Sequence, residues 1–278
     1  MSTPITNQLT DQVTNKCIGF IGAGVMGTAI IKSLLKAGLS ANQICVFEKD
    51  STKAADIASN LGVNLKGISE FAESCDVLFL AVKPQDLGDL LAKFNKSLKP
   101  KCLVISIAAG KTTAFIEEAL GQNNPVIRVM PNTPAQIGKG VSAISAGKFA
   151  GAEDLALANQ LMSASGIVVE LPENQQDAVT ALSGSGPAYF FNFVEEMIKG
   201  GISLGLTEEI ATKLAIGTIS GSAAMLQESG LDAATLRKNV TSPNGTTAAA
   251  LNVFSESNLS EIVGKAMKAA RDRAQELA

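Results

Sequence analysis

The sequence predicts an α/β protein in which a doubly wound, mainly parallel sheet is followed by an all-helical half. Two observations lead to this fold class. From Cys17 to Glu170, short β-rich runs alternate with helical stretches, and the strands are apolar throughout. Such strands are typical of a parallel sheet that helices cover on both faces. After Pro172 the β-branched runs disappear, and apolar residues recur with helical spacing.

Eight segments of the first part are short runs of β-branched, aromatic or other apolar residues, as expected of buried strands. They are 17–21, 44–47, a weak one at 63–65, 77–82, 103–107, 126–129, 141–145 and 167–170. Between them a helical apolar period predicts helices. These are 25–37, closed by Gly38, about 53–61, a helix after Pro84, 113–120 and about 154–165. The second half is expected to hold helices at about 175–202, 207–228, 246–255 and 260–278.

With 278 residues the chain can form one large or two ordinary domains. The change in residue pattern after Pro172 places the boundary near residue 171. We expect a sheet domain of the dinucleotide-binding type at 16–171 and a helical domain at 172–278. Residues 1–15 are polar and lack the features of a signal peptide, so we expect a flexible arm. No apolar run is long enough to span a bilayer, which predicts a cytoplasmic protein without membrane contact.

The composition excludes several kinds of mechanism. The sequence contains no His and no Trp, which rules out Ser-His-Asp hydrolases, His-zinc enzymes and His-dependent hydroxyacid dehydrogenases. Its four cysteines (Cys17, Cys45, Cys75 and Cys102) are widely spaced, without a C-x-x-C pair, so we expect inert thiols in a reducing compartment and no metal site. A net charge of −3 without a basic cluster argues against nucleic acid as a partner.

The clearest motif is Gly22-Ala23-Gly24-Val25-Met26-Gly27, between an expected strand and an expected helix. It is the dinucleotide-binding fingerprint of Rossmann-like folds. Its first two glycines allow a tight turn and close approach of the backbone to a pyrophosphate, and the third lets the helix pack on the strand. Free N–H groups at the start of the helix would bind the anion. Because strand, helix and following elements agree, the motif predicts nucleotide binding rather than an incidental turn.

The end of the second strand is expected to contact the adenosine ribose. Glu48 lies 21 residues after Gly27, near the usual offset of an acid that bonds the ribose 2′-hydroxyl of NAD. A carboxylate there would repel the 2′-phosphate of NADPH, and therefore favours NADH. Lys49 and Lys53 act in the opposite direction, and all three charges could also be simply solvated. The sequence leaves the choice between the two cofactors open.

Two further segments follow expected strands at the carboxyl edge of the sheet, where α/β proteins bind ligands. They are Ala81-Val82-Lys83-Pro84 and Met130-Pro131-Asn132-Thr133-Pro134. In the second, two prolines hold the backbone around Asn132, whose amide is suited to a nicotinamide ribose or carboxamide. The alternative is a rigid turn without a ligand role.

Two stretches interrupt the helical pattern of the second half. Residues 182–189 contain Gly and Pro close together, which break or kink a helix. Residues 240–247 are small and mostly polar and lead straight into an expected helix. Hydroxyls, an amide and free N–H groups at a helix start form a cradle for a small carboxylate, although an ordinary N-cap turn is the alternative. The apolar helical half predicts a dimer interface; a self-contained bundle is the other possibility.

Six stretches together resemble Δ1-pyrroline-5-carboxylate reductase, the last enzyme of proline synthesis. They are residues 19–24, 81–84, 106–110, 128–134, 177–189 and 242–247. The resemblance covers the chain after the arm, and its last two stretches are the most specific. It implies hydride transfer from NADPH or NADH to the C=N carbon of a cyclic imine, which gives L-proline. It also implies an intertwined homodimer, often assembled into decamers, with each active site between one nucleotide domain and the partner's helices.

The resemblance also implies roles for individual residues. The loop would hold the substrate carboxylate, and Thr247 would act as the catalytic residue by hydrogen-bonding the ring nitrogen. The expected substrate-binding residues are Ser242, Asn244, Gly245, Thr246 and Thr247. Lys83 and Asn132 would line the nicotinamide. The expected cofactor-binding residues are Gly22, Gly24, Val25, Met26, Gly27, Glu48, Lys49, Ala81, Val82, Lys83, Pro84, Ala108 and Asn132.

The absence of histidine fits this chemistry, because an imine nitrogen is more basic than a carbonyl oxygen and can enter as the iminium ion. One departure is Glu48, where the family often has Ser, Asn or Arg for a 2′-phosphate. Residues 19–27 also resemble β-hydroxyacid dehydrogenases, but those enzymes need a Lys with Asn four residues later, and no lysine here has one. A non-catalytic NAD(P)-sensing protein is a further alternative, against which the intact loop at 242–247 argues.

Overall fold

The structure is a computed structural model that describes residues 13, 15–94 and 97–277. The arm expected at 1–15 therefore lies outside the described residues, except for Val13 and Asn15. The chain divides into two compact units. The first ends at Ser185 and also includes the stretch from Ala270 to the end of the chain, and the second is Gly186–Ala269. Each unit is described by itself.

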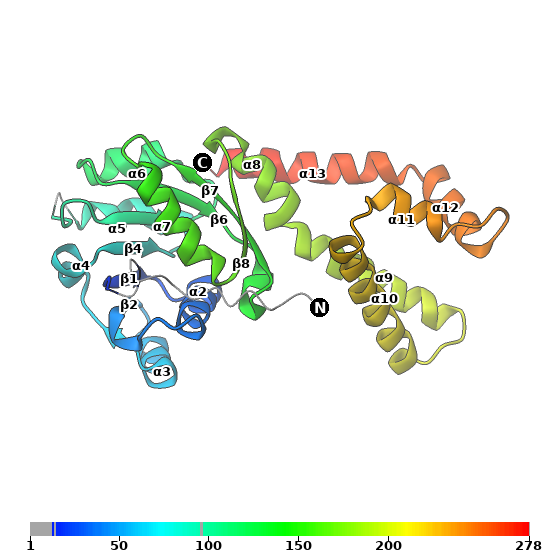
Figure 1. Cartoon of the computed structure of the whole chain (residues 1–278), viewed down its shortest axis with the longest axis horizontal. Helices are drawn as coiled ribbons and strands as arrows, with labels where there is room; N and C mark the ends of the chain where they lie inside the picture. Colours follow the sequence, from blue (N-terminus) through cyan, green and yellow to red (C-terminus); the bar gives the residue numbers. More distant parts are fainter. Residues whose placement is uncertain (1–12, 14, 95–96, 278) are drawn as a thin grey trace. The chain divides into compact units, whose positions relative to one another are not determined.

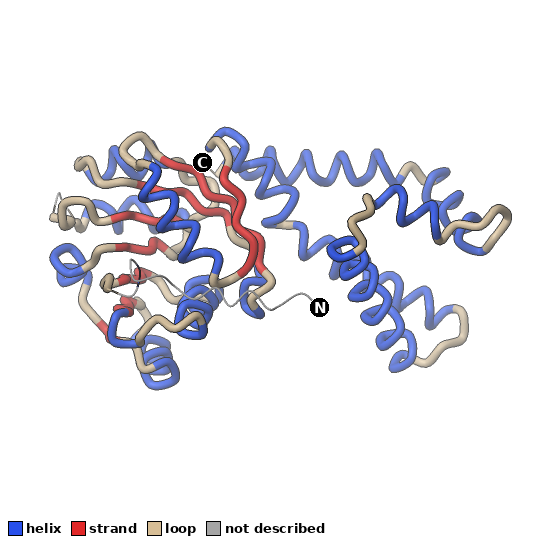
Figure 2. The backbone as a smooth tube through the Cα atoms, in the orientation of Figure 1, coloured by secondary structure: helices blue, strands red, loops and turns tan. Residues whose placement is uncertain are grey.

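The first unit is built on an eight-stranded sheet with the order β3-β2-β1-β4-β5-β6-β7-β8 (Figures 1 and 2). Its strands are β1 (Ile18–Ile21), β2 (Ile44–Phe47), β3 (Asn64–Leu65), β4 (Val77–Leu80), β5 (Leu103–Ser106), β6 (Val126–Met130), β7 (Gly140–Ala146) and β8 (Gly166–Glu170). All neighbours pair in parallel except β6 and β7, which are antiparallel. The chain order reverses beside β1, so ligands are expected at the carboxyl ends of β1 and β4.

Helices cover both faces of this sheet. They are α2 (Val25–Lys36), α3 (Ser51–Leu61), α4 (Ile68–Ser74), α5 (Leu87–Ala92), α6 (Thr113–Leu120), α7 (Ala152–Ser163) and the short α8 (Gln176–Val179). Buried side chains of α2, α3 and α7 form one core cluster with the sheet, and those of α4, α5 and α6 form another on the opposite face. In the first cluster the rings of Phe20 and Phe79 stack with centroids 4.5 Å apart. This two-sided burial explains why the strands are apolar throughout.

The second unit is entirely helical. It contains α9 (Gly186–Ser203), α10 (Glu208–Glu228), α11 (Ala233–Asn239), α12 (Thr246–Glu256) and the first part of α13 (Leu259–Glu276). The helix expected at about 175–202 is not continuous: α8 is followed by a single π-helical turn, Thr180–Gly184, before α9 begins. Many large apolar side chains of this unit are exposed, and Phe190 and Phe191 each retain 62% of their accessible surface.

The structure confirms the predicted fold class, a doubly wound, mainly parallel sheet followed by helices. Two short helices, α4 and α11, are absent from the prediction, since each is only seven residues long. The strand expected at 77–82 ends at Leu80. The domain boundary near residue 171 stays a prediction. It lies beside the end of β8 at Glu170, whereas the compact units divide fifteen residues further on, after Ser185.

Within the described residues, none of the helices combines the length and the apolar character that crossing a membrane requires.

Candidate active site

A sharp turn at Gly22 joins three strands at the carboxyl edge of the sheet. The N–H of Gly22 donates to the carbonyl oxygen of Phe47 at the end of β2, 2.8 Å away, and the N–H of Ala81 after β4 donates to Ile21 at 2.8 Å. Gly22 has φ +89°, and a Cβ atom on it would lie 2.6 Å from the carbonyl oxygen of Ala81. Only glycine combines this conformation with such close contact.

The amino end of α2 opens directly from this turn. Gly24 is its N-cap and, as a glycine, supplies no capping side chain. The space where a Cβ of Gly24 would point is open, whereas a Cβ on Gly27 would lie 2.8 Å from the carbonyl oxygen of Gly22. Val25 is 69% exposed and Met26 packs partly on the core. The glycines therefore bring helix and strand together and leave the helix start open, while the binding of an anion there stays a prediction.

Glu48 follows β2 and reaches back to the glycine turn. One carboxylate oxygen accepts from the N–H of Ala23 at 3.0 Å and lies 3.4 Å from the Lys53 ammonium, and the other accepts from the N–H of Asp50 at 3.3 Å. Burial would raise the pKa of Glu48, but these two N–H groups and Lys53 hold the pKa below its usual range. The carboxylate is therefore ionised at neutral pH. Lys49 beside it is exposed.

The same edge carries the loops after β4 and β5. Pro84 opens a short 3₁₀ turn, and Lys83 before it is exposed. After β5, the N–H of Ile107 donates to Leu80 at 3.1 Å, and the N–H of Ala108 donates to the hydroxyl of Ser106 at 3.3 Å. The backbone of the two loops is thus joined, and the expected cofactor residues at 22–27, 48–49, 81–84 and 108 all belong to one edge of the sheet.

Asn132, the last expected cofactor residue, is a buried bridge. Its amide oxygen accepts from the N–H of Val141 at the start of β7, 2.8 Å away, and its amide nitrogen donates to the carbonyl oxygen of Ser183 in the π-helical turn at 3.1 Å. Only 7% of the residue is exposed. Most of the bonding capacity that the sequence analysis assigned to nicotinamide is therefore engaged within the protein, and a direct contact of Asn132 with the cofactor stays a prediction.

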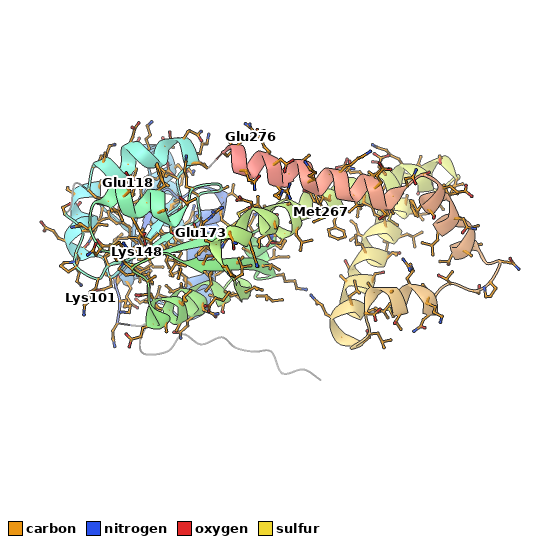
Figure 3. The ribbon with its side chains drawn as sticks, turned by 90° about the horizontal axis from the view of Figure 1, so that it is seen from above. Lys101, Glu118, Lys148, Glu173, Met267 and Glu276 are labelled. Carbon is orange, nitrogen blue, oxygen red and sulfur yellow. The ribbon has the colours of Figure 1, made fainter. Side chains whose placement is uncertain are left out.

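A buried arginine fixes the segment that precedes this turn. Arg128, in the middle of β6, is 4% exposed and contacts Asp177 at 3.1 Å and Glu173 at 3.6 Å. Glu173, which Figure 3 labels, also accepts from the N–H and the hydroxyl of Thr113, both at 2.7 Å. Gln176 donates to Ala143 and Ser145 of β7. These bonds hold the stretch from Glu173 to Asp177 against β6, β7 and the start of α6.

The expected substrate loop lies in the second unit, before α12. Asn244 adopts the left-handed conformation with φ +57°, and the N–H of Gly245 donates to Ser242 at 3.1 Å. Gly245 packs so closely on the Ser242 side chain that a Cβ would not fit. It is the N-cap of α12 and, as a glycine, supplies no capping side chain. Thr247 is half-buried, while Thr246 is exposed.

Comparisons with known proteins agree with these motifs. Residues 173–277 match the family model described as pyrroline-5-carboxylate reductase dimerisation, and residues 17–110 match the model described as NADP oxidoreductase, coenzyme F420-dependent. Over 263 residues the chain is 41% identical to pyrroline-5-carboxylate reductase of Pseudomonas aeruginosa, which covers 94% of this chain and 96% of that protein. The chain belongs to the pyrroline-5-carboxylate reductase family.

Two solved structures of pyrroline-5-carboxylate reductases share its fold. The Coxiella burnetii protein superposes with a TM-score of 0.89 at 37% identity, covering 95% of this chain and 98% of that one. The Plasmodium falciparum protein, solved with NADP bound, has a TM-score of 0.86 at 30% identity, with coverage of 95% and 98%. The resemblance found in the sequence motifs is thereby confirmed, and so is the oxidoreductase class with a nicotinamide cofactor.

For a member of this reductase family, the structure gathers the expected cofactor residues in the first unit and the expected substrate residues in the second. Two features escaped sequence reasoning: the Arg128 cluster, and the π-helical form of the break at Thr180–Gly184, where the Gly and Pro of residues 182–189 indicated only a broken or kinked helix. A charged residue inside the apolar run 126–130, followed by acids four residues apart at 173 and 177, was the available signal for the cluster.

Among the described residues, no group of three or more His, Cys, Asp or Glu side chains is arranged to hold a metal ion. The four cysteines are free, and burial raises the pKa of Cys102 to about 12.

Replacing Asn132 by Ala is expected to lower the free energy of unfolding by about 1–3 kcal/mol, because the partly buried N–H of Val141 and carbonyl of Ser183 lose their partner. Urea titration followed by circular dichroism measures this. Asn64→Ala is the matched control, since Asn64 makes one exposed hydrogen bond to Asn42 and should cost less than about 0.5 kcal/mol. Equal effects of the two substitutions would contradict a bridging role for Asn132.

Proposed function

We propose that this chain reduces 1-pyrroline-5-carboxylate to L-proline, the last step of proline biosynthesis, with a hydride from NADH or NADPH. The observation that carries the proposal is a pair of helix starts. α2 and α12 each begin at a glycine N-cap without a capping side chain, and each follows one of the two family motifs. The two helices have 12 and 11 residues, which is long enough for their amino ends to attract anions. The first suits a pyrophosphate and the second a small carboxylate.

The residues at the sheet edge fit a nicotinamide dinucleotide. Gly24 leaves open space beside the free N–H groups of α2, and Glu48 holds the turn in place through Ala23. When bound, the reduced cofactor supplies the hydride. The residues expected to hold it are those of the glycine turn, Glu48 and Lys49, the loop 81–84, Ala108 and Asn132. The buried bridge of Asn132 supports mainly an indirect role, in shaping this edge.

On the substrate side, the loop Ser242–Gly245 and the start of α12 hold the carboxylate by N–H groups and hydroxyls. Thr247 orients the ring nitrogen through its hydroxyl, and Thr246 and Asn244 complete the cradle. The nitrogen enters protonated as the iminium ion, or takes its proton from water, so no histidine is needed. Positioning of the C=N carbon for hydride transfer is then the main task of the protein.

Glu48 supports NADH as the preferred cofactor. Its ionised carboxylate lies at the end of β2, where a 2′-phosphate would meet like charge. Lys53 offsets only part of this charge, because its ammonium is already paired with the Glu48 carboxylate at 3.4 Å. Lys49 is exposed and free to attract a phosphate, so the discrimination that we propose is moderate.

The deciding experiment follows the oxidation of NADH and NADPH separately with 1-pyrroline-5-carboxylate. We expect turnover with both and about tenfold higher kcat/KM with NADH, a difference of about 1.4 kcal/mol. Glu48→Gln should shift the ratio toward NADPH, because it removes the repelling charge. Asp56→Asn, which neutralises an exposed carboxylate on the nearby helix α3, should leave the ratio unchanged. No turnover with either cofactor would sink the proposed reaction; a ratio unaffected by Glu48→Gln would sink the NADH assignment alone.

Thr247→Ala is expected to lower kcat/KM for the imine about tenfold, as the loss of one hydrogen bond to the ring nitrogen implies. Thr247→Ser, which keeps the hydroxyl, should retain most of the activity. Thr241→Ala is the control on the same loop, because that hydroxyl already donates to the carbonyl of Arg237 at 2.6 Å. Full activity of Thr247→Ala would show that this side chain does not orient the substrate.

The apolar surface of the second unit supports a homodimer. Its helices expose large side chains that a partner would cover. Among those that retain between 52% and 62% of their surface are Phe190, Phe191, Leu214, Ile216, Val253 and Ile262. Residues 173–277 match the dimerisation model of the family, so a second copy of this chain is the partner that we propose. A decamer built from five such dimers is the larger assembly that the resemblance implies.

Light scattering coupled to size-exclusion chromatography is expected to give twice the chain mass of 28.7 kDa, or ten times that mass if dimers assemble further. Phe191→Glu should lower the mass toward that of one chain, because it places a charge on the apolar surface. Glu118→Lys, an exposed charge change on α6, is the control that should leave the mass unchanged. A wild-type protein of 28.7 kDa would contradict the dimer.

The four free cysteines support the cytoplasm as the compartment, because reducing conditions keep thiols unpaired there.

A further inference from the structure

The last turn of the chain packs against the loop after β5, and both belong to the first unit. Gly110, in that loop, is buried and has φ +80°. A Cβ atom on it would lie 3.0 Å from the carbonyl carbon and oxygen of Leu277 and 3.2 Å from its Cβ. Ala274, one turn earlier, is only 5% exposed. Figure 3 labels Glu276 at this end of α13.

The loop between β5 and α6 is anchored at its two ends by other bonds. At its start, Ile107 donates to Leu80 and Ala108 to Ser106. At its far end, Thr112 caps α6 and Thr113 donates twice to Glu173. Leu277 contacts the loop between these anchors, at Gly110. The backbone there must take a left-handed conformation with Leu277 against it, which leaves the loop little freedom to shift.

We propose that the turn that follows α13, through Leu277, is a positioning element of the cofactor site. It holds the loop Ser106–Gly110 in place, and Ala108 in this loop belongs to the sheet edge that binds the nicotinamide cofactor under the proposed function, on which this inference rests. Leu277 does not touch the reacting atoms. Its contribution is to the affinity for the cofactor, because a loop that is already ordered loses less freedom on binding.

Gly110→Ala is expected to raise the Kd for the reduced cofactor about fivefold, equivalent to about 1 kcal/mol, with kcat at saturating cofactor changed less than twofold. The added Cβ must displace Leu277 or the loop itself. Isothermal titration measures the Kd without turnover, and steady-state kinetics gives kcat and the KM for each substrate. The KM for the imine should stay unchanged while the KM for the cofactor rises. A general loss of folded protein would not produce this difference between the two substrates.

Gly62→Ala is the matched control. Gly62 also has a left-handed backbone, with φ +69°, but a Cβ there would meet only Ala41 at 3.7 Å, an ordinary contact. The two substitutions therefore share the backbone strain and differ in the collision. Equal effects on the Kd would mean that strain alone, and not the contact with Leu277, is responsible, and would overturn the proposal.

A shortened chain that ends at Glu276 provides the second test. It lacks Leu277, so it should also bind the cofactor more weakly, and adding Gly110→Ala to it should have a smaller effect than in the full chain, because the atoms that the Cβ would meet are gone. Strictly additive effects, or an unchanged Kd in the shortened chain, would refute the role of Leu277. If the full chain itself binds neither NADH nor NADPH, the proposed function fails instead, so the two failures are distinguishable.

Discussion

The close approach of backbone at Gly22 is the constraint on which the candidate site depends. Three strands end within hydrogen-bonding distance of this turn, and the carbonyl oxygen of Ala81 occupies the place where any side chain of residue 22 would begin. This turn also sets where α2 starts, and therefore where the free N–H groups of that helix point. Glu48 adds a second restraint by bonding Ala23. A change at this turn would move the glycine loop, the helix start and the loop after β4 together.

Buried ion pairs stabilise the part of the sheet around β6. Arg128 is buried in β6 and would be costly without partners, but Glu173 and Asp177 surround it. Those acids also hold the stretch that leads into the π-helical turn, where Ser183 meets Asn132. Single π-helical turns often occur at functional sites, and this one ends where the second unit begins. The ion pairs of Arg128 thus fix the stretch from Glu173 to Asp177, which leads into this turn.

Most of the fold could be predicted from periodicity. Continuous apolar strands and helical spacing are local properties, and they identified seven of the eight strands clearly and the short β3 as a weak one. Prediction failed for α4 and α11, which are too short to show a helical period. The Gly and Pro of residues 182–189 indicated a break in the helix expected at about 175–202, but not that it takes the form of a π-helical turn at Thr180–Gly184. The contacts around this turn are not local: Asn132 donates to the carbonyl oxygen of Ser183, and Arg128 pairs with Asp177. Asn132 and Arg128 lie about fifty residues earlier in the chain, and no local pattern contains these pairings.

The sequence by itself determined the fold class, the family, and the composition of both candidate binding motifs, because glycine spacing, apolar runs and small polar clusters act through the backbone nearby. It also determined, through the absence of histidine, that the chemistry cannot rest on an imidazole. Only the tertiary structure decided what Asn132, Glu48 and Gly110 contact. Their partners are 9 to 167 residues away in the chain, at Val141, Ala23 and Leu277. Such pairings follow from how strands and helices pack, and side-chain type alone does not specify them.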